Sequence, residues 1–143
     1  MVPQHDKPFS EIQIGDELPV LKKSITQGVI DLYAKASEDP NPLHTDPEFA
    51  KTTPFKGTIA HGTMYLAYIS EMIMQWFPTQ WISGGQMEVS FLAPARPGDV
   101  LSVRGKVVEK LDGPEGREVL LDISCHTQDD KTIVVGRARC PVR

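Results

Sequence analysis

Hydrophobic and polar residues follow different periods in the two halves of the chain. In the second half, apolar residues recur at every second position along segments of about residues 86–93, 101–107, 119–126 and 134–140. This alternation is typical of strands with one covered face and one solvated face. The pattern therefore predicts a run of antiparallel strands, separated by turns that carry Gly, Pro and Asp.

The first half follows a helical period after a short extended segment over residues 11–25. Apolar positions recur at helical spacing after Thr26, a residue type that caps helix N-termini well. The helix is expected to run to about Ser37, because Pro40 disfavours helical geometry in the residue before it. A second short helix is expected after Asp46, which can cap it, with Pro47 at its first position.

Residues 63–76 are apolar on nearly every face of a helix, which is typical of a buried helix. In a small protein such a helix needs a sheet wrapped around it, and the downstream strands can supply that sheet. The order of helices first and strands afterwards therefore predicts an α+β protein, with a curved antiparallel sheet around a long central helix, known as the hot-dog fold. No repeat or linker divides the 143 residues, so we expect a single domain over residues 1–143.

Composition narrows the classes of function. The net charge of −4 argues against a nucleic-acid partner, which would favour a basic surface. The N-terminus lacks the pattern of a secretory signal, and no apolar run is long enough to span a bilayer, so we expect a cytoplasmic protein without a membrane partner. Cys125 and Cys140 show no metal-ligand spacing, so no metal site is predicted and both are expected to be apolar strand residues.

The candidate chemistry lies in the sequence SEDPNPLHTD, residues 37–46. Asp39 and His44 are separated by a short stretch in which Pro40 and Pro42 leave the backbone few conformations. A carboxylate and an imidazole held in this way can exchange protons with one water molecule. The same residue types are also the commonest turn formers, so an ordinary surface turn is the alternative interpretation.

Gly62 is expected to open the central helix, where free backbone N–H groups suit an anion or a developing oxyanion. Ser70 lies about two helical turns later and is placed either to orient a neighbouring group or to bond its own helix. His61 is expected to pack or to form local hydrogen bonds rather than to act as a base. No nucleotide-binding or nucleophile motif is present, so the sequence predicts an acid–base site that needs no cofactor.

Several of these stretches together resemble the MaoC-like dehydratases and (R)-specific enoyl-CoA hydratases. The similarity rests on DPNPLH at residues 39–44, DPEFA at 46–50 and IAHG at 59–62, and it continues in QMEVSF at 86–91 and PARPGDVL at 94–101. It extends over most of the chain. The first motif, together with the His-Gly that follows it, is the specific part. The strand motifs are less specific, because hot-dog thioesterases share similar turns.

The resemblance implies roles for individual residues. Asp39 and His44 match the catalytic acid–base pair of the family, and Asn41 matches an Asn that helps to fix the loop. Gly62 matches the glycine whose N–H binds the thioester carbonyl oxygen, and Ser70 matches a serine that supports the catalytic Asp. The sequence departs from the family pattern at Glu38, Pro40 and Thr63. Because the catalytic groups are intact, these differences are expected to affect the shape of the substrate more than the reaction.

The resemblance also implies a substrate, an acyl thioester of CoA or of acyl carrier protein, and a homodimer or higher homo-oligomer with sites near the subunit interface. The acyl chain is expected beside apolar residues of the central helix, and the phosphates of the carrier near surface arginines. These substrate-binding candidates are Met64, Tyr65, Met72, Trp76, Arg96 and Arg104. Two other functions stay open at this stage: a hot-dog acyl-CoA thioesterase, and a non-catalytic acyl-thioester-binding subunit of a heterodimer.

Overall fold

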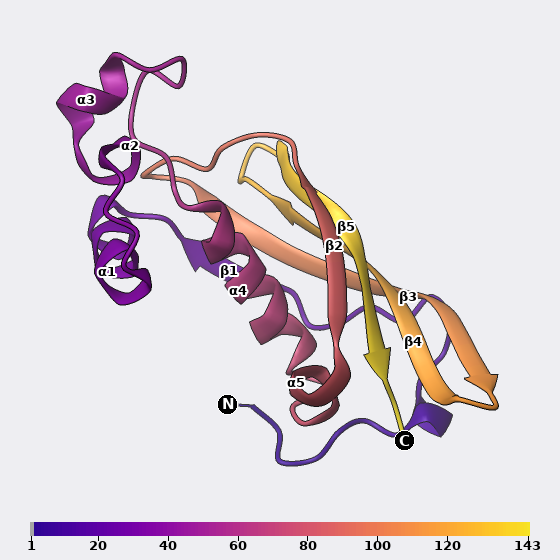
Figure 1. The fold of residues 1–143 in the computed structure, drawn as a ribbon. Coiled ribbons are helices and arrows are strands. Elements are labelled where there is room, and N and C mark those ends of the chain that lie inside the picture. The colour runs from indigo at the N-terminus through magenta and orange to yellow at the C-terminus, as the bar shows by residue number, and fades with distance from the viewer. Residues whose placement is uncertain (1) are drawn as a thin grey trace.

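The alternating segments form one antiparallel sheet, as their pattern predicts. A computed structural model describes residues 2–143 (Figure 1). Its five strands lie in the order β1-β3-β4-β5-β2, so the edge strand β2 follows the helices in sequence but pairs with the last strand of the chain. The strands are β1 (Leu21–Ser24), β2 (Gln86–Phe91), β3 (Val100–Gly113), β4 (Gly116–His126) and β5 (Thr132–Pro141).

The central helix α4 (Gly62–Ile73) packs against one face of this sheet (Figure 1). The two layers approach closely at Gly105 of β3, where a Cβ atom would lie only 2.8 Å from Cε of Met72. This helix and the curved sheet confirm the hot-dog fold. The helix is shorter than predicted, and it is not buried all round, since Thr63 and Ala67 are exposed. A single sheet can cover only one side of a helix, which explains the difference.

Both predicted caps of the early helices are present. Thr26 Oγ1 accepts a hydrogen bond from the Val29 N–H at 3.0 Å and begins α1 (Gln27–Ser37). Asp46 accepts from the Glu48 N–H at 3.0 Å and begins α3 (Pro47–Lys51).

Three short helices were not expected from the pattern. These are η1 (Phe9–Glu11), α2 (Pro42–Thr45) within the Asp/His stretch, and α5 (Gln80–Gly84) after the central helix. The helices α1 to α3 stand beyond the N-terminal end of α4, away from the main part of the sheet (Figure 1). Residues 38–61 therefore form a region that overhangs the beginning of the central helix.

The cysteines lie where the alternation places them. Cys125 and Cys140 are free and buried on the helix-facing side of the sheet, and burial raises the pKa of each thiol to about 12. They therefore act as small apolar core residues. Among residues 2–143, no helix combines the length and the apolar character that crossing a bilayer requires.

Candidate active site

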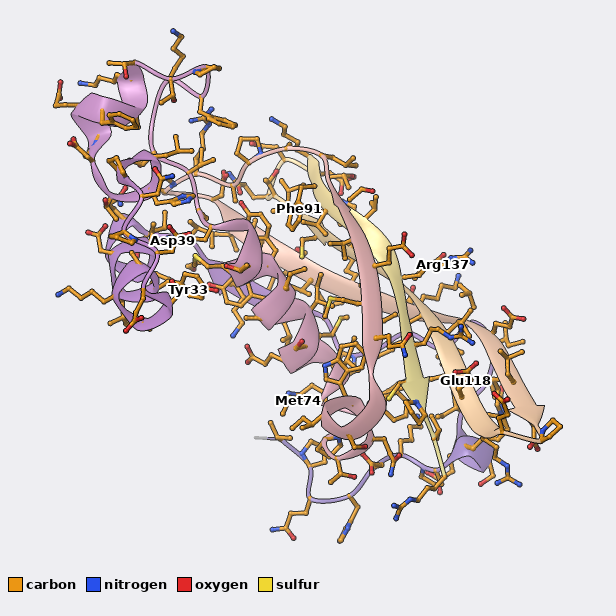
Figure 2. All side chains as sticks on the ribbon, in the orientation of Figure 1. Tyr33, Asp39, Met74, Phe91, Glu118 and Arg137 are labelled. Atoms are coloured by element: carbon orange, nitrogen blue, oxygen red, sulfur yellow. The ribbon has the colours of Figure 1, made fainter. Side chains whose placement is uncertain are left out.

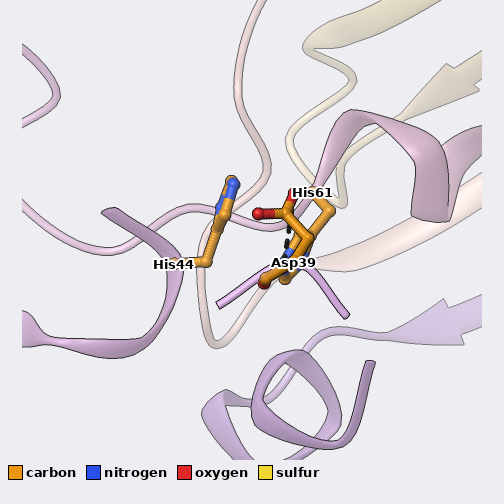
Figure 3. A group of neighbouring side chains, drawn as sticks. All are labelled: Asp39, His44 and His61. Atoms are coloured by element: carbon orange, nitrogen blue, oxygen red, sulfur yellow. Dashed lines mark hydrogen bonds and ion pairs between the residues drawn. The ribbon is translucent and has the colours of Figure 1, made fainter. Parts of the chain in front are cut away.

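Three polar side chains meet where the overhanging region contacts the start of α4. The ligand-type atoms of Asp39, His44 and His61 all lie within 4.8 Å of one another (Figure 3). Asp39 follows α1, His44 belongs to α2, and His61 is the residue immediately before α4. The cluster therefore joins three helices that the chain brings together through one continuous segment.

Local hydrogen bonds hold the segment between Asp39 and His44. Asp39 Oδ1 accepts from the Asn41 N–H at 3.3 Å, and Asn41 Oδ1 accepts from the Leu43 N–H at 2.9 Å. The second bond caps α2, in which Pro42 occupies the first position. Asp39 is half exposed, so its second carboxylate oxygen can reach water or a ligand. The stretch is both a turn and a rigid support for an acid and an imidazole.

The hydrogen bond of His44 fixes its tautomer. Nδ1 lies 2.8 Å from the carbonyl oxygen of Ile59. A carbonyl can only accept, so Nδ1 carries a proton, and Nε2 is the nitrogen left as acceptor when the ring holds one proton. His44 is therefore arranged to take a proton through Nε2.

Gln27 supports the backbone of His44 from α1. Its Nε2 donates to the His44 carbonyl at 2.8 Å, and its Oε1 accepts from the buried Thr58 hydroxyl at 2.7 Å. Thr58 lies next to Ile59, the partner of the imidazole. Gln27 thus ties together the two segments that hold the ring. No sequence motif marks this residue, because its role depends on contacts between distant segments.

His61 packs under His44, in agreement with the expectation that it packs and bonds locally. The two rings are stacked, with centroids 3.8 Å apart and planes inclined by 25°. Nε2 of His61 lies 3.2 Å from the Asp39 carbonyl oxygen, while Nδ1 is buried without a partner among the described residues. Burial lowers the pKa of His61, and the neighbouring His44 acts in the same direction against the opposing effect of Asp39. Burial and His44 therefore favour the neutral form of the His61 ring.

The three side chains are also residue types that bind metal ions, although the sequence did not predict a metal site. An imidazole binds a metal through a nitrogen lone pair that lies in the plane of the ring. The rings of His44 and His61 are stacked with their planes inclined by only 25°, which is a poor geometry for two imidazoles to point at one ion. The arrangement observed is suited to proton transfer.

Gly62 lies at the N-terminus of α4, next to His61. The first N–H groups of a helix have no acceptor within the helix, and they form its positive end. A Cβ atom at position 62 would lie 3.0 Å from Cε1 of Phe91, so the aromatic ring of β2 covers the glycine closely. Figure 2 shows Tyr33 and Asp39 on the α1 side of this helix end and Phe91 on the β2 side.

An apolar cavity of about 280 Å³ lies beside the helix N-terminus. Tyr65 contributes its ring, while its hydroxyl accepts a hydrogen bond from the Ala95 N–H at 2.8 Å. Burial raises the pKa of Tyr65 to about 12, so the phenol stays protonated. The lining residues are Phe55, Ile59, Ala60, Gly62, Tyr65, Phe91, Leu92, Ala93 and Pro94. The cavity can accept an apolar group attached to a polar group at the helix end.

The other candidates on the central helix lie apart from this cavity. Met64 lines a second apolar groove of about 260 Å³ between α1 and α4. Met72 packs in the core against Gly105, and the Trp76 ring lies beyond the helix with Lys7 Nζ 4.0 Å from its centroid. Ser70 is half-buried on α4, and among the described residues its hydroxyl makes no hydrogen bond with Asp39.

The two arginine candidates lie in different places. Arg96 Nη2 donates to the Phe55 carbonyl at 2.6 Å, which puts its guanidinium group near the rim of the cavity that Phe55 lines. Arg104 points from β3 to the face of the sheet opposite α4, where it lines a separate open groove. The structure therefore brings Arg96, and not Arg104, near the candidate site.

Two further features of Tyr33 and Phe91 were not anticipated. The Tyr33 hydroxyl donates a hydrogen bond to Thr63 Oγ1 at 2.7 Å, and the Tyr33 ring centroid lies 4.9 Å from that of His61. Phe91 lies in the alternating segment 86–93 and its ring lies over Gly62, yet 54% of it is exposed. Tyr33 lies among the apolar positions that recur after Thr26, and these predict only a helix face. Neither feature has a signal at short range in the sequence.

Comparisons with known proteins identify relatives over most of the chain. Residues 11–127 match the family described as MaoC like domain. The chain is 32% identical over 130 residues to the (R)-specific enoyl-CoA hydratase of Rhodospirillum rubrum, covering 91% of this chain and 88% of that protein. It is 31% identical over 122 residues to the 3-hydroxybutyryl-CoA dehydratase of Methylorubrum extorquens, covering 85% and 76% respectively.

A solved structure shows the same architecture. The (R)-hydratase from A. caviae involved in PHA biosynthesis superposes with a TM-score of 0.79 at 27% sequence identity. The alignment covers 93% of this chain and 98% of that one.

Proposed function

This chain belongs to the MaoC-like family of hydratases and dehydratases that act on acyl thioesters, and we propose that it reversibly hydrates trans-2-enoyl thioesters to (R)-3-hydroxyacyl thioesters. The observation that carries the proposal is the position of the Asp39–His44 pair beside the N-terminus of α4. A water molecule between the pair and a carbonyl oxygen at Gly62 would bring together all groups that the reaction needs.

In the proposed reaction, His44 Nε2 takes a proton from water while the water oxygen forms a bond to the β-carbon. The double-bond electrons move toward the thioester, and the negative charge on its carbonyl oxygen is stabilised by the N–H of Gly62. The imidazolium then returns a proton to the α-carbon, which restores the neutral ring. Asp39 would orient the water through its free carboxylate oxygen and stabilise the imidazolium. Loss of water follows the same steps in reverse.

The substrate would enter with its acyl group in the apolar cavity, which supports Tyr65 as a binding residue. The carrier part of the bound thioester, CoA or acyl carrier protein, would extend out of the cavity past Phe55. Arg96 at that rim is the candidate that could meet a carrier phosphate.

A second copy of the chain is part of this proposal. Phe91 and Leu92 are 54% and 58% exposed at the end of β2, and the outer edge of β2 has no strand partner within residues 2–143. Pairing of two such edges would cover these exposed side chains and enclose the cavity. We therefore expect a homodimer, which sedimentation equilibrium would detect. A monomer at micromolar concentration with full activity would contradict this expectation.

Incubation with crotonyl-CoA tests the reaction directly, with the enoyl absorbance and the free thiol followed together. Loss of absorbance without thiol release is the expected result. Thiol release would point to a thioesterase. If neither the absorbance nor the free thiol changes with enoyl-CoA substrates of several chain lengths, both activities are contradicted. The remaining alternative would then be a non-catalytic acyl-thioester-binding subunit. Asp39→Asn and His44→Ala should each fold and lose most of the turnover, and near-normal rates would refute their roles.

A further inference from the structure

We propose that His61 is a positioning residue that fixes Asp39 and His44 relative to each other, acting as a neutral ring that carries its proton on Nε2. This inference rests on the proposed hydration activity. It differs from a role in proton transfer, because His61 would touch neither water nor substrate.

The first contact fixes the backbone of Asp39. The Nε2–H of His61 donates to the Asp39 carbonyl at 3.2 Å, and the Asp39 N–H donates to the Ala34 carbonyl at 3.1 Å. Ala34 lies near the end of α1, and His61 precedes α4. The peptide groups on both sides of the carboxylate are therefore anchored to different helices. Removal of the His61 donor would release one of these anchors.

The second contact fixes the ring of His44. The carbonyl of Ile59 holds one edge of this ring, and the stacked ring of His61 supports its face. Both supports come from the short segment that leads into α4. An imidazole held at an edge and at a face has one orientation, so Nε2 stays directed toward the reacting atoms.

His61 cannot easily serve as a third acid or base. Its Nε2 proton is used by the Asp39 carbonyl, and its Nδ1 is buried without a partner in the described chain. The groups that face it are Asp39, His44 and Tyr33, whose ring packs on it. A phenylalanine would fill the same space without a buried unpaired nitrogen. The Nε2–H donor is therefore the property that distinguishes histidine here.

Two substitutions separate the two contacts. His61→Phe keeps an aromatic face for stacking and loses the donor, whereas His61→Gln can place an amide N–H near the position of Nε2 and loses the ring. His126→Phe is the matched control, because His126 lies on β4 and lines the groove on the far side of the sheet. Each protein is first checked for folding by its thermal unfolding temperature.

We expect His61→Phe to stay folded and to lower kcat about 10–100-fold with little change in KM, as misplacement of catalytic groups does. His61→Gln should recover part of this loss, and His126→Phe should match the wild type. The pH profile of kcat/KM should keep its limbs in His61→Phe. Unchanged kcat in His61→Phe, or loss of one limb of its pH profile, would overturn the proposal.

Nitrogen-15 spectra of the histidine rings test the same inference without turnover. In the wild type, His61 should stay neutral with its proton on Nε2, and His44 should show one tautomer with its proton on Nδ1. In His61→Gln, which removes the stacked ring, His44 should become a mixture of tautomers, whereas His61→Phe should keep the single tautomer. Titration of His61 near neutral pH, or an unchanged His44 tautomer in His61→Gln, would refute the positioning role even if the protein hydrates no enoyl thioester.

Discussion

The aromatic ring of Phe91 lies directly over the backbone of Gly62. A Cβ atom at position 62 would be 3.0 Å from Cε1 and 3.3 Å from Cζ of that ring, closer than packed side chains normally approach. The edge strand β2 thereby forms one wall of the space in front of the α4 N-terminus. In the proposed reaction, the absence of a side chain at Gly62 would let the thioester carbonyl group approach the helix end beside this ring.

Gly62→Ala should reduce activity far more than stability. Alanine favours the helix, and the half-exposed Phe91 ring can move by the few tenths of an ångström required, so the unfolding temperature should change little. The displaced ring would narrow the cavity, and kcat/KM for crotonyl-CoA should fall about 10–100-fold. The double variant Gly62→Ala/Phe91→Leu should recover part of the loss. Full activity in the single variant would show that this contact is unimportant.

Glu38→Gly should stabilise the protein. Glu38 caps α1 in the left-handed region, with a φ of 57°, which glycine adopts without strain. The strain relieved is about 1–2 kcal/mol, and the greater freedom of glycine in the unfolded chain offsets about half of it. Urea denaturation should therefore show a gain of about 0.5–1 kcal/mol.

Asp130→Gly provides the control for that gain. Asp130 has a similar φ of 60° in the turn between β4 and β5, away from the site. The gain there should be smaller, because a short polar side chain tolerates this region better than Glu does. A loss of stability in Glu38→Gly would contradict the strain argument.

Asn41→Ala should weaken α2 and with it the position of His44. The Asn41 side chain accepts the Leu43 N–H at 2.9 Å, and loss of such a cap costs about 1 kcal/mol. We expect a similar drop in the free energy of unfolding and a several-fold lower kcat. Asn41→Ser keeps a capping oxygen without adding charge, and it should restore most of both quantities. Equal kcat values for Asn41→Ala and Asn41→Ser would show that the helix cap does not affect the position of His44.

Stability should fall in mild acid because of His61. Its pKa in the folded protein is lowered from 6.5 by burial, so below about pH 6.5 the unfolded chain binds more protons than the folded one. The stability contributed by the neutral ring is therefore complete above that pH and is lost as the pH falls toward the lowered value. Free energies of unfolding measured between about pH 5 and pH 8 should show a steeper acid loss for the wild type than for His61→Phe. Parallel curves would exclude this source of pH dependence.

Signals within a few residues predicted much of the architecture. Thr26 and Asp46 each carry the oxygen that caps the next helix, and the alternation in the second half identified the strands. Pro40 and Pro42 indicated that Asp39 and His44 are held in one segment. These features depend on neighbours along the chain, so the sequence contains them directly.

Contacts between distant segments could not be predicted in the same way. The stack of His61 on His44 and the bond of Gln27 to the His44 backbone arise only when α2 packs against α1 and against the segment before α4. Alternation puts Phe91 on the helix-facing side, where its ring lies over Gly62, but it could not show that the rest of the ring is exposed at the end of an edge strand. The pattern also could not show that Arg104 and Arg96 lie in different regions of the molecule.

All groups proposed to act on the reacting atoms belong to residues 39–62, whereas Phe91 and residues 92–94 of the cavity wall come from a separate part of the chain. In the proposed reaction, the reacting groups and the β2 side of the cavity would thus be encoded in different stretches of sequence, while Phe55, Ile59 and Ala60 form another part of the wall. Evolution or a protein engineer can exchange the wall residues for others of different size while the acid–base pair and the helix end stay unchanged. A library that varies positions 91–94 alone is accordingly the most economical route to variants that accept new acyl groups.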